Sequence, residues 1–290
     1  MSKTSLHTRR IAIAAILLSI ALVLRLFVTF YLPIYGAHGH RVSPGMIFAI
    51  LPAILFGPVY GAIVAGLFDL LGWVLRPVNA FIPWMTVVVT AGGFMRGLLW
   101  RGLQNRSRRV LRTCLLVFAV VLLLFGLANF AFLSADGLDA NFYASHDPQS
   151  IDTSEMHLIS RLLVERTQGA ASPADALAGM HIAVTWGFLG AAFFALLLLC
   201  LEFAFSKWLV KKERFDKLLP LTITILLAGL FVSIMNTFVL HPVFWPAIPF
   251  EAVLIPRVIA SLLVDTIFVY FVALLLGLFE RQESLKELVR

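Results

Sequence analysis

Residues Ile11–Leu32 read IAIAAILLSIALVLRLFVTFYL, with Arg25 as the single charged side chain. About 20 apolar residues in a helix are enough to cross the hydrocarbon core of a bilayer, so this stretch predicts a membrane-spanning helix. The basic residues of Met1–Arg10 in front of it resemble the start of a signal peptide. However, the apolar run is longer than the about 7–15 residues of a signal sequence, and no small-residue cleavage site follows. We therefore expect an uncleaved first span.

Further apolar stretches continue to the end of the chain. They are Val42–Gly57, Gly61–Leu75, Trp84–Trp100, Thr113–Leu133, His181–Phe205, Leu219–Leu240 and Val253–Phe279. Hydrophobic residues make up 60% of the chain and charged residues 13%, whereas soluble domains have about 45–50% and about 25%. This composition excludes a soluble globular fold and a disordered chain. It predicts an all-α polytopic membrane protein with about eight transmembrane helices, in which residues 1–290 form a single membrane domain.

The basic residues indicate the orientation of these spans. With the N-terminus inside, seventeen of the 23 lysines and arginines fall on the same side, Arg96 and Arg101 among them. Basic residues retain their loops in the cytoplasm, so we expect both termini to be cytoplasmic. The net charge of +7 is then a signal of topology and not of nucleic-acid binding.

The loop 134–180 lies outside the cell on this topology. It carries seven acidic residues against Arg161 and Arg166. Within it, Glu155–Gln168 has apolar residues at helical spacing and predicts a short amphipathic helix. Those apolar residues are Met156, Ile159, Leu162 and Leu163.

The chain lacks the usual signatures of catalysis. It has no GxxxxGK[ST] loop for ATP, no HExxH or clustered metal ligands, no GxSxG and no CxxC. We therefore expect no enzymatic activity, no catalytic residue, no cofactor and no metal.

Several arginines depart from the inside bias and gather toward the outer half of the protein. They are Arg25, Arg41, Arg76 and Arg257. Arginine binds carboxylates through two parallel hydrogen bonds, so these side chains are candidates for an outward-facing anion pocket. The alternative is that Arg41 and Arg76 extend to the interface and that Arg25 pairs with Asp69 or Asp265, two acids within predicted spans.

Aromatic and polar residues collect at the same end of the predicted spans. The candidates for contacts with a flat ring are Asn79, Phe81, Trp84, Thr86, Asn236 and Trp245. Small-molecule sites are mostly apolar with a few polar anchors, which this set could supply. An interfacial belt of aromatic residues is the alternative interpretation.

Small residues at four-residue spacing mark predicted helix contacts. Gly61 with Ala65 and Gly93 with Gly97 would let two helices approach closely. On the first span, Ala12, Ala15 and Ser19 form a small-residue face that could contact another membrane subunit. Packing within the chain is the commoner use of such spacing.

The stretch Pro52–Gly72, PAILFGPVYGAIVAGLFDLLG, resembles the second and third helices of S components of energy-coupling-factor (ECF) vitamin transporters. Phe81–Thr86 (FIPWMT) is similar to the FPGFT stretch of the folate-type branch, with Trp84 at the glycine of that motif. Leu254–Arg257 (LIPR) is similar to its LPxR. The resemblance covers Arg10–Trp100 and, more weakly, Leu219–Phe279.

The resemblance implies a small membrane subunit that captures a vitamin outside a bacterial cell, in the cytoplasmic membrane. A transmembrane coupling subunit and two ATPases would then drive import, which agrees with the missing ATP-binding loop. Carried over, Arg257 would contact the ligand or a neighbouring loop, and Trp84–Thr86 would shape the pocket wall. A folate-like ligand, which joins a flat ring to carboxylates, fits the arginines and aromatic residues.

The family usually has six helices, so two of the predicted spans are interpreted as an insertion. On this interpretation residues 10–110 hold helices 1–4 of the family, residues 111–206 an inserted helix pair, and residues 207–290 helices 5–6. Two other functions remain open. One is a membrane scaffold or assembly subunit without a small-molecule ligand, and the other is a self-sufficient ion-coupled transporter, which would usually show an internal repeat.

Overall fold

The structure is a computed structural model that describes residues 3–32, 40–77, 80–139, 142, 150–168, 173–208, 217–246, 248 and 250–281. These residues form nine α-helices and two short β-strands. In chain order the elements are α1 (Lys3–Phe27), β1 (Phe30–Leu32), β2 (His40–Val42), α2 (Gly45–Phe56), α3 (Pro58–Leu75), α4 (Pro83–Leu103), α5 (Arg108–Ala135), α7 (Leu158–Thr167), α8 (Pro173–Trp208), α9 (Leu218–Phe244) and α10 (Phe250–Arg281).

Six of the described helices are long and apolar enough to cross a membrane. They are α1, α3, α5, α8, α9 and α10. Helix α2 is apolar but has only 12 residues, and α4 has 21 residues that include Arg96 and Arg101. All eight apolar runs of the sequence are therefore largely helical, and the prediction of a polytopic helical membrane protein is confirmed.

The predicted end of the first span was wrong, because the helix does not continue to Leu32. Helix α1 stops at Phe27, and Phe30–Leu32 forms strand β1, which pairs with β2 in an antiparallel hairpin. Tyr31 lies opposite Arg41 in this register. The β-branched and aromatic residues after Phe27 favour extended backbone, and the polar Thr29 hydroxyl caps α1 by donating to the Arg25 carbonyl.

The contacts divide the chain into two compact units. Unit 1 comprises Met1–Arg108, Leu209–Val239 and Ala260–Arg290. Unit 2 comprises Arg109–Trp208 and Leu240–Ile259. Helices α9 and α10 each contribute one part to each unit, and the two units are described separately below.

The core of unit 1 is built from α1, α2, α3, Trp100 of α4 and the parts of α9 and α10 that belong to the unit. Helices α2 and α3 are joined at Gly57, whose φ of 98° is in the left-handed region that glycine adopts most readily. Pro58 then opens α3 at a position where the missing N–H costs no helical hydrogen bond. The GP pair thus forms the tight turn between the predicted stretches Val42–Gly57 and Gly61–Leu75.

Helices α3 and α4 pack closely within this unit. A Cβ atom on Gly61 would collide with the Gly93 carbonyl oxygen, and a Cβ on Gly93 would collide with that of Gly61. Gly97 lies equally close to the backbone of Pro58. The glycines at four-residue spacing therefore serve packing within the chain, the commoner of their two uses.

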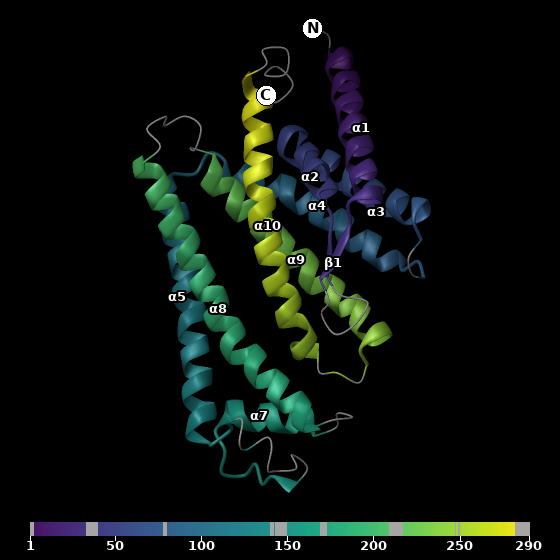
Figure 1. Cartoon of the computed structure of the whole chain (residues 1–290). Helices are drawn as coiled ribbons and strands as arrows, with labels where there is room; N and C mark the ends of the chain where they lie inside the picture. Colours follow the sequence, from purple (N-terminus) through teal and green to yellow (C-terminus); the bar gives the residue numbers. More distant parts are fainter. Residues whose placement is uncertain are drawn as a thin grey trace. The chain divides into compact units, whose positions relative to one another are not determined.

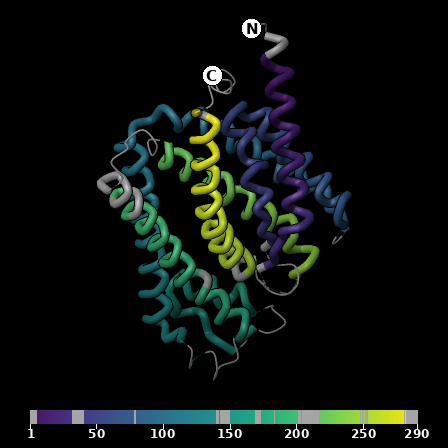
Figure 2. The backbone as a smooth tube through the Cα atoms, turned by 45° about the horizontal axis from the view of Figure 1, so that its top comes forward, coloured from purple at the N-terminus to yellow at the C-terminus, as the bar shows by residue number. Residues whose placement is uncertain are grey.

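The two ends of unit 1 differ. The start of α1 and the end of α10 point to the same end of the unit, and the β1–β2 hairpin lies at the opposite end of α1 (Figures 1 and 2). We call the end with the hairpin the hairpin end. It is the part of unit 1 where the charged side chains described below meet.

In unit 2, α5 and α8 run side by side (Figures 1 and 2), with the rings of Phe125 and Phe188 6.2 Å apart. Helix α7 lies against the last turn of α5, where the Ser160 hydroxyl donates to the Phe132 carbonyl. The predicted helix at 155–168 exists, but Leu162, expected on its apolar face, is 56% exposed. The buried side chains around α7 form a small apolar core, which consists of Leu133, Leu138, Leu163, Val164, Leu177 and Met180.

Candidate functional site

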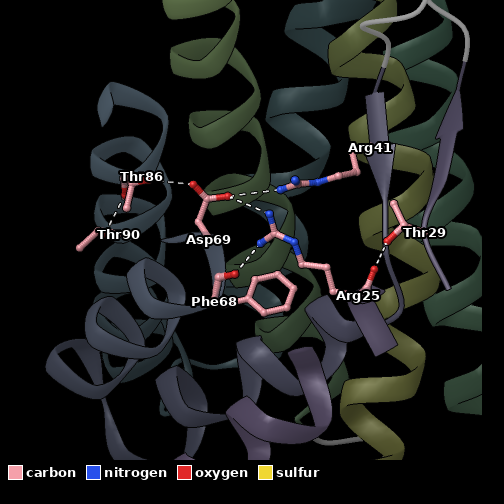
Figure 3. Close-up of polar contacts among 7 residues, drawn as sticks. All are labelled: Arg25, Thr29, Arg41, Phe68, Asp69, Thr86 and Thr90. Carbon is pink, nitrogen blue, oxygen red and sulfur yellow. Dashed lines mark hydrogen bonds and ion pairs between the residues drawn. The ribbon is translucent and has the colours of Figure 1, made fainter. Parts of the chain in front are cut away.

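Asp69 of α3 is the centre of the polar network at the hairpin end (Figure 3). Its Oδ1 atom lies 3.5 Å from Arg25 Nη2 and 3.3 Å from Arg41 Nη2. Its Oδ2 atom accepts a hydrogen bond of 2.9 Å from the Thr86 hydroxyl. One buried carboxylate thus joins α1, β2, α3 and α4.

Arg25 is fixed on several sides. Its Nη1 donates to the Phe68 carbonyl, and its guanidinium carbon lies 4.9 Å from the centre of the Phe68 ring. A Cβ on Gly72 would collide with the guanidinium, so the glycine leaves room for the Arg25 side chain in its present position beside α3. A buried arginine needs such partners, because an unpaired charge is costly away from water. Arg25 is therefore held in place rather than presented to solvent.

Arg41 is the accessible cation of the network. Its side chain is 38% exposed, whereas that of Arg25 is 5% exposed. Two guanidinium groups share the one carboxylate of Asp69, so these three side chains carry a formal charge of +1. An arginine that is partly exposed and has spare N–H donors can bind a second carboxylate.

Arg76 follows α3 and is exposed. Its Nη1 donates to the Leu26 carbonyl at 3.0 Å, which connects the end of α3 to the end of α1. This contact brings a third predicted site arginine to the hairpin end. Asn79, another predicted site residue, lies outside the residues that the structure describes.

A mainly apolar groove of about 570 Å³ lies between α3 and α4. Its lining residues are Ala62, Phe81, Pro83, Thr86, Val87, Thr90, Ala91 and Phe94. Phe81 packs on Trp73 with 4.9 Å between ring centres, and Thr86 connects the groove to Asp69. Trp84 is not among the lining residues and is 68% exposed. The resemblance implied that its ring forms part of a pocket wall, but the Trp84 side chain is exposed at the start of α4.

Asp265 of α10 has a different partner from the one considered in the sequence analysis. Arg25 pairs with Asp69, and the charged group that acts on Asp265 is Arg96 of α4. Arg96 was counted among the cytoplasmic basic residues, but it is 3% exposed and points into unit 1. In the sequence Arg96 lies between Gly93 and Gly97, the two α4 glycines that contact α3. This position could have identified it as an interior residue.

Asn236 of α9 also belongs to unit 1. Its side-chain oxygen is buried and has no hydrogen-bond partner among the described residues. No described contact joins Asn236 to the network around Asp69.

Arg257 and Trp245 lie in unit 2. The guanidinium carbon of Arg257 is 5.4 Å from the centre of the Trp245 ring, and both side chains are buried. Close by, the ring of His241 hydrogen-bonds with the Ile248 carbonyl at 2.7 Å. The structure thus brings these two predicted site residues together, in a different unit from Arg25, Arg41 and Arg76.

Two carboxylates of the acidic loop form contacts within its described residues. Asp136 accepts from the backbone N–H of His157 at 3.1 Å and pairs with its ring at 2.8 Å. Burial raises the pKa of Asp136, but hydrogen bonds from Ser160 and His157 outweigh this effect and hold the pKa below its ordinary value of 3.8. Asp152 accepts from the Ser154 N–H in a local turn. These carboxylates stabilise the loop that contains them.

The predicted docking face of α1 is exposed. Ala12, Ala15 and Ser19 all lie on the surface of the helix, and the Ser19 hydroxyl donates to the Ala15 carbonyl at 2.9 Å. Ile11, Ile16 and Val23 are exposed beside them. This apolar surface of α1 is therefore exposed in the described part of the chain.

Comparison with known protein families gives a match over part of the chain. Residues 9–146 match the family model described as "ECF transporter, substrate-specific component". The match begins in α1, covers the network around Asp69 and continues through α5, the first helix of the pair interpreted as an insertion. No curated protein and no solved structure matches the chain. Residues 9–146 of this chain are thus similar to the substrate-specific components of ECF transporters.

Proposed function

We propose that this multi-pass membrane protein is the S component of an ATP-driven ECF importer and that it binds a small, anionic, vitamin-like substrate with high affinity. We further propose that the substrate is folate-like. The single observation that carries the proposal is the charge balance at the hairpin end. Arg25 and Arg41 share the carboxylate of Asp69, and the partly exposed Arg41 has donors to spare. A carboxylate of the substrate would complete this arrangement.

The surroundings of the network also suit a ring-containing ligand. The groove between α3 and α4 has about 570 Å³, within the range of about 300–1,000 Å³ for small-molecule sites. It is mainly apolar and includes Phe81, and Thr86 forms its polar link to Asp69. A flat heterocycle would bury its faces there, while Arg41 and Arg76 would attract the acidic part. Arg257 on Trp245 in unit 2 remains a second candidate ligand contact.

The similarity of residues 9–146 to this family suggests partners. We propose a transmembrane coupling subunit and two ATPases, with the coupling subunit packing against Ala12, Ala15 and Ser19 of α1. The exposure of this face supports the proposal, because small side chains allow another helix to approach closely. We further propose that both termini are cytoplasmic, that the hairpin end faces outward, and that residues 111–206 are an addition to the six helices of the family.

The test is to identify the ligand directly. Protein purified in mild detergent would be analysed by mass spectrometry for co-purifying small molecules. Binding of folate, of a folate lacking its carboxylates and of an uncharged vitamin would then be measured by calorimetry. We expect folate to bind more tightly than its carboxylate-free analogue. Failure of every tested vitamin to bind, with nothing co-purifying, would instead favour the membrane scaffold.

A further inference from the structure

Unit 1 contains a second buried charge pair, away from the network around Asp69. Arg96 of α4 is 3% exposed and Asp265 of α10 is 6% exposed, and each acts electrostatically on the other. The described residues include no hydrogen bond or ion pair that joins the two side chains directly. The Nε atom of Arg96 has no hydrogen-bond partner among these residues.

Close helix contacts fix where these groups lie. A Cβ on Gly229 of α9 would collide with the carboxylate of Asp265, so this carboxylate rests directly on the α9 backbone. A Cβ on Gly92 of α4 would collide with Val232 of α9. Arg96 follows Gly92 by one helical turn, and α9 therefore lies alongside both charged residues.

Hydroxyl groups occupy the next turns of α9 and α10. Ser261, one turn before Asp265, donates to its Oδ2 atom at 3.3 Å. Ser233, one turn after Gly229, is 4% exposed, and its hydroxyl has no hydrogen-bond partner among the described residues. The interior between α4, α9 and α10 thus contains a cation, an anion and a hydroxyl whose hydrogen-bonding capacity is not fully used.

The chemistry of this set selects a small neutral ligand. Arg96 offers an N–H donor, Asp265 is an acceptor and Ser233 is both, while the two charges cancel. An added ion would upset that balance at a high cost in a buried position. A water molecule can accept from one group and donate to the others, and buried waters in proteins typically make about three such hydrogen bonds.

We propose that Arg96, Asp265 and Ser233 bind a water molecule, which bridges the Arg96–Asp265 pair and thereby ties α4, α9 and α10 together. This site does not depend on the identity of the transported substrate. It explains why a full charge is placed on α4 where that helix is buried, and why α9 has a glycine opposite Asp265.

A double-mutant cycle tests the coupling. Arg96→Gln alone leaves a buried carboxylate without its counter-charge, and Asp265→Asn alone leaves a buried guanidinium. We expect each single change to lower the melting temperature in detergent by about 10 °C. The double variant should lose less than the sum of the two. Additive losses would overturn the proposal, and Asp139→Asn in the loop of unit 2 serves as a control that should leave the melting temperature unchanged.

A second cycle tests the placement on α9. Gly229→Ala should destabilise the protein when Asp265 is present, and Gly229→Ala should be tolerated in an Asp265→Ser background, where the shorter side chain leaves room for the methyl group. Equal effects in both backgrounds would contradict the contact.

The water itself is tested by an experimental structure of the unmodified protein at high resolution, which does not depend on any variant folding. We expect a density peak within hydrogen-bonding distance of Arg96 Nε and of an oxygen of Asp265 or Ser233. A direct Arg96–Asp265 ion pair without such a peak would overturn the proposal.

Discussion

Arg41 Nη2 lies 3.3 Å from Asp69 Oδ1, the same oxygen atom that Arg25 approaches to 3.5 Å. Arg25 is buried and has the Phe68 carbonyl and ring as further partners, so it does not depend on Asp69 alone. Among the described contacts the Arg41 side chain has only Asp69 as a hydrogen-bond or ion-pair partner, and it is partly exposed. The two arginines therefore differ: Arg25 is a buried counter-charge of Asp69, whereas the side chain of Arg41 is partly accessible to solvent.

Replacing Arg41 by alanine should weaken substrate binding. A hydrogen bond to a charged group contributes about 1.5–3 kcal/mol, so the Kd for an anionic ligand should rise about tenfold to a hundredfold. Arg41→Lys should recover part of the loss, because the charge returns without the planar fork. Calorimetry gives the Kd, and Arg106→Ala at the other end of unit 1 is the control. An unchanged Kd would remove Arg41 from the site.

Replacing Asp69 by asparagine should destabilise the protein. The change leaves the buried Arg25 and the partly buried Arg41 without an anion, and breaking a buried pair in this way costs about 3 kcal/mol. The melting temperature in detergent should fall clearly. Adding Arg25→Met to Asp69→Asn should recover part of the loss, because the buried charge is removed as well. A melting temperature equal to that of the unmodified protein would show that the carboxylate is not needed for neutralisation.

Enlarging Ala15 should separate capture from transport. Ala15→Leu adds a bulky side chain to the exposed face of α1, where close approach of another helix depends on small residues. We expect normal substrate binding by the purified protein and impaired uptake by the assembled importer. Val59→Leu on α3, which is 60% exposed, is the matched control. Normal uptake with Ala15→Leu would argue against docking at this face.

Acid should weaken the contact of Asp136 with His157, which joins the end of α5 to the start of α7 in unit 2. The pKa of Asp136 is held below its ordinary value in the folded protein, so this group stabilises the fold above about pH 4. That stabilisation is lost as the pH falls through the lowered pKa and the carboxylate becomes protonated. Hydrogen exchange of the α7 amides, corrected for its intrinsic pH dependence, should therefore accelerate between about pH 5 and about pH 2.

The Asp136→Asn variant provides the control for this acid effect. It should exchange faster than the unmodified protein at pH 5 and show a smaller change on acidification. Amides in α3 of unit 1 should respond much less. Equal acceleration in α3 and α7 would mean that acid destabilises the whole chain and not this contact.

Most of the fold followed from local patterns. Each apolar run became a helix, since backbone groups in a membrane must satisfy one another within the segment. The Gly57–Pro58 turn and the glycine contacts of α3 and α4 also followed from spacing alone. The hairpin was missed, because Phe30–Leu32 is as apolar as a span and forms a strand only by pairing with His40–Val42.

The candidate site was only partly predictable. The sequence marked Arg25, Arg41 and Thr86 as residues of interest, and Arg25 as a possible partner of Asp69. It did not show that both arginines approach one oxygen atom, or that Trp84 faces outward. It also assigned Arg96 to the cytoplasmic charges, because charge counting along a chain does not distinguish the lipid-exposed side of a helix from its packed side.

The sequence by itself determined that this chain spans a membrane with helices, where the α2–α3 turn falls and which small residues allow close packing. These features depend on neighbours within a few turns of the same segment. Only the tertiary structure decided which charges meet. The ion pairs of Asp69 with Arg25 and Arg41, and the electrostatic interaction of Asp265 with Arg96, depend on helix register and rotation. These are set by packing between residues far apart in the chain.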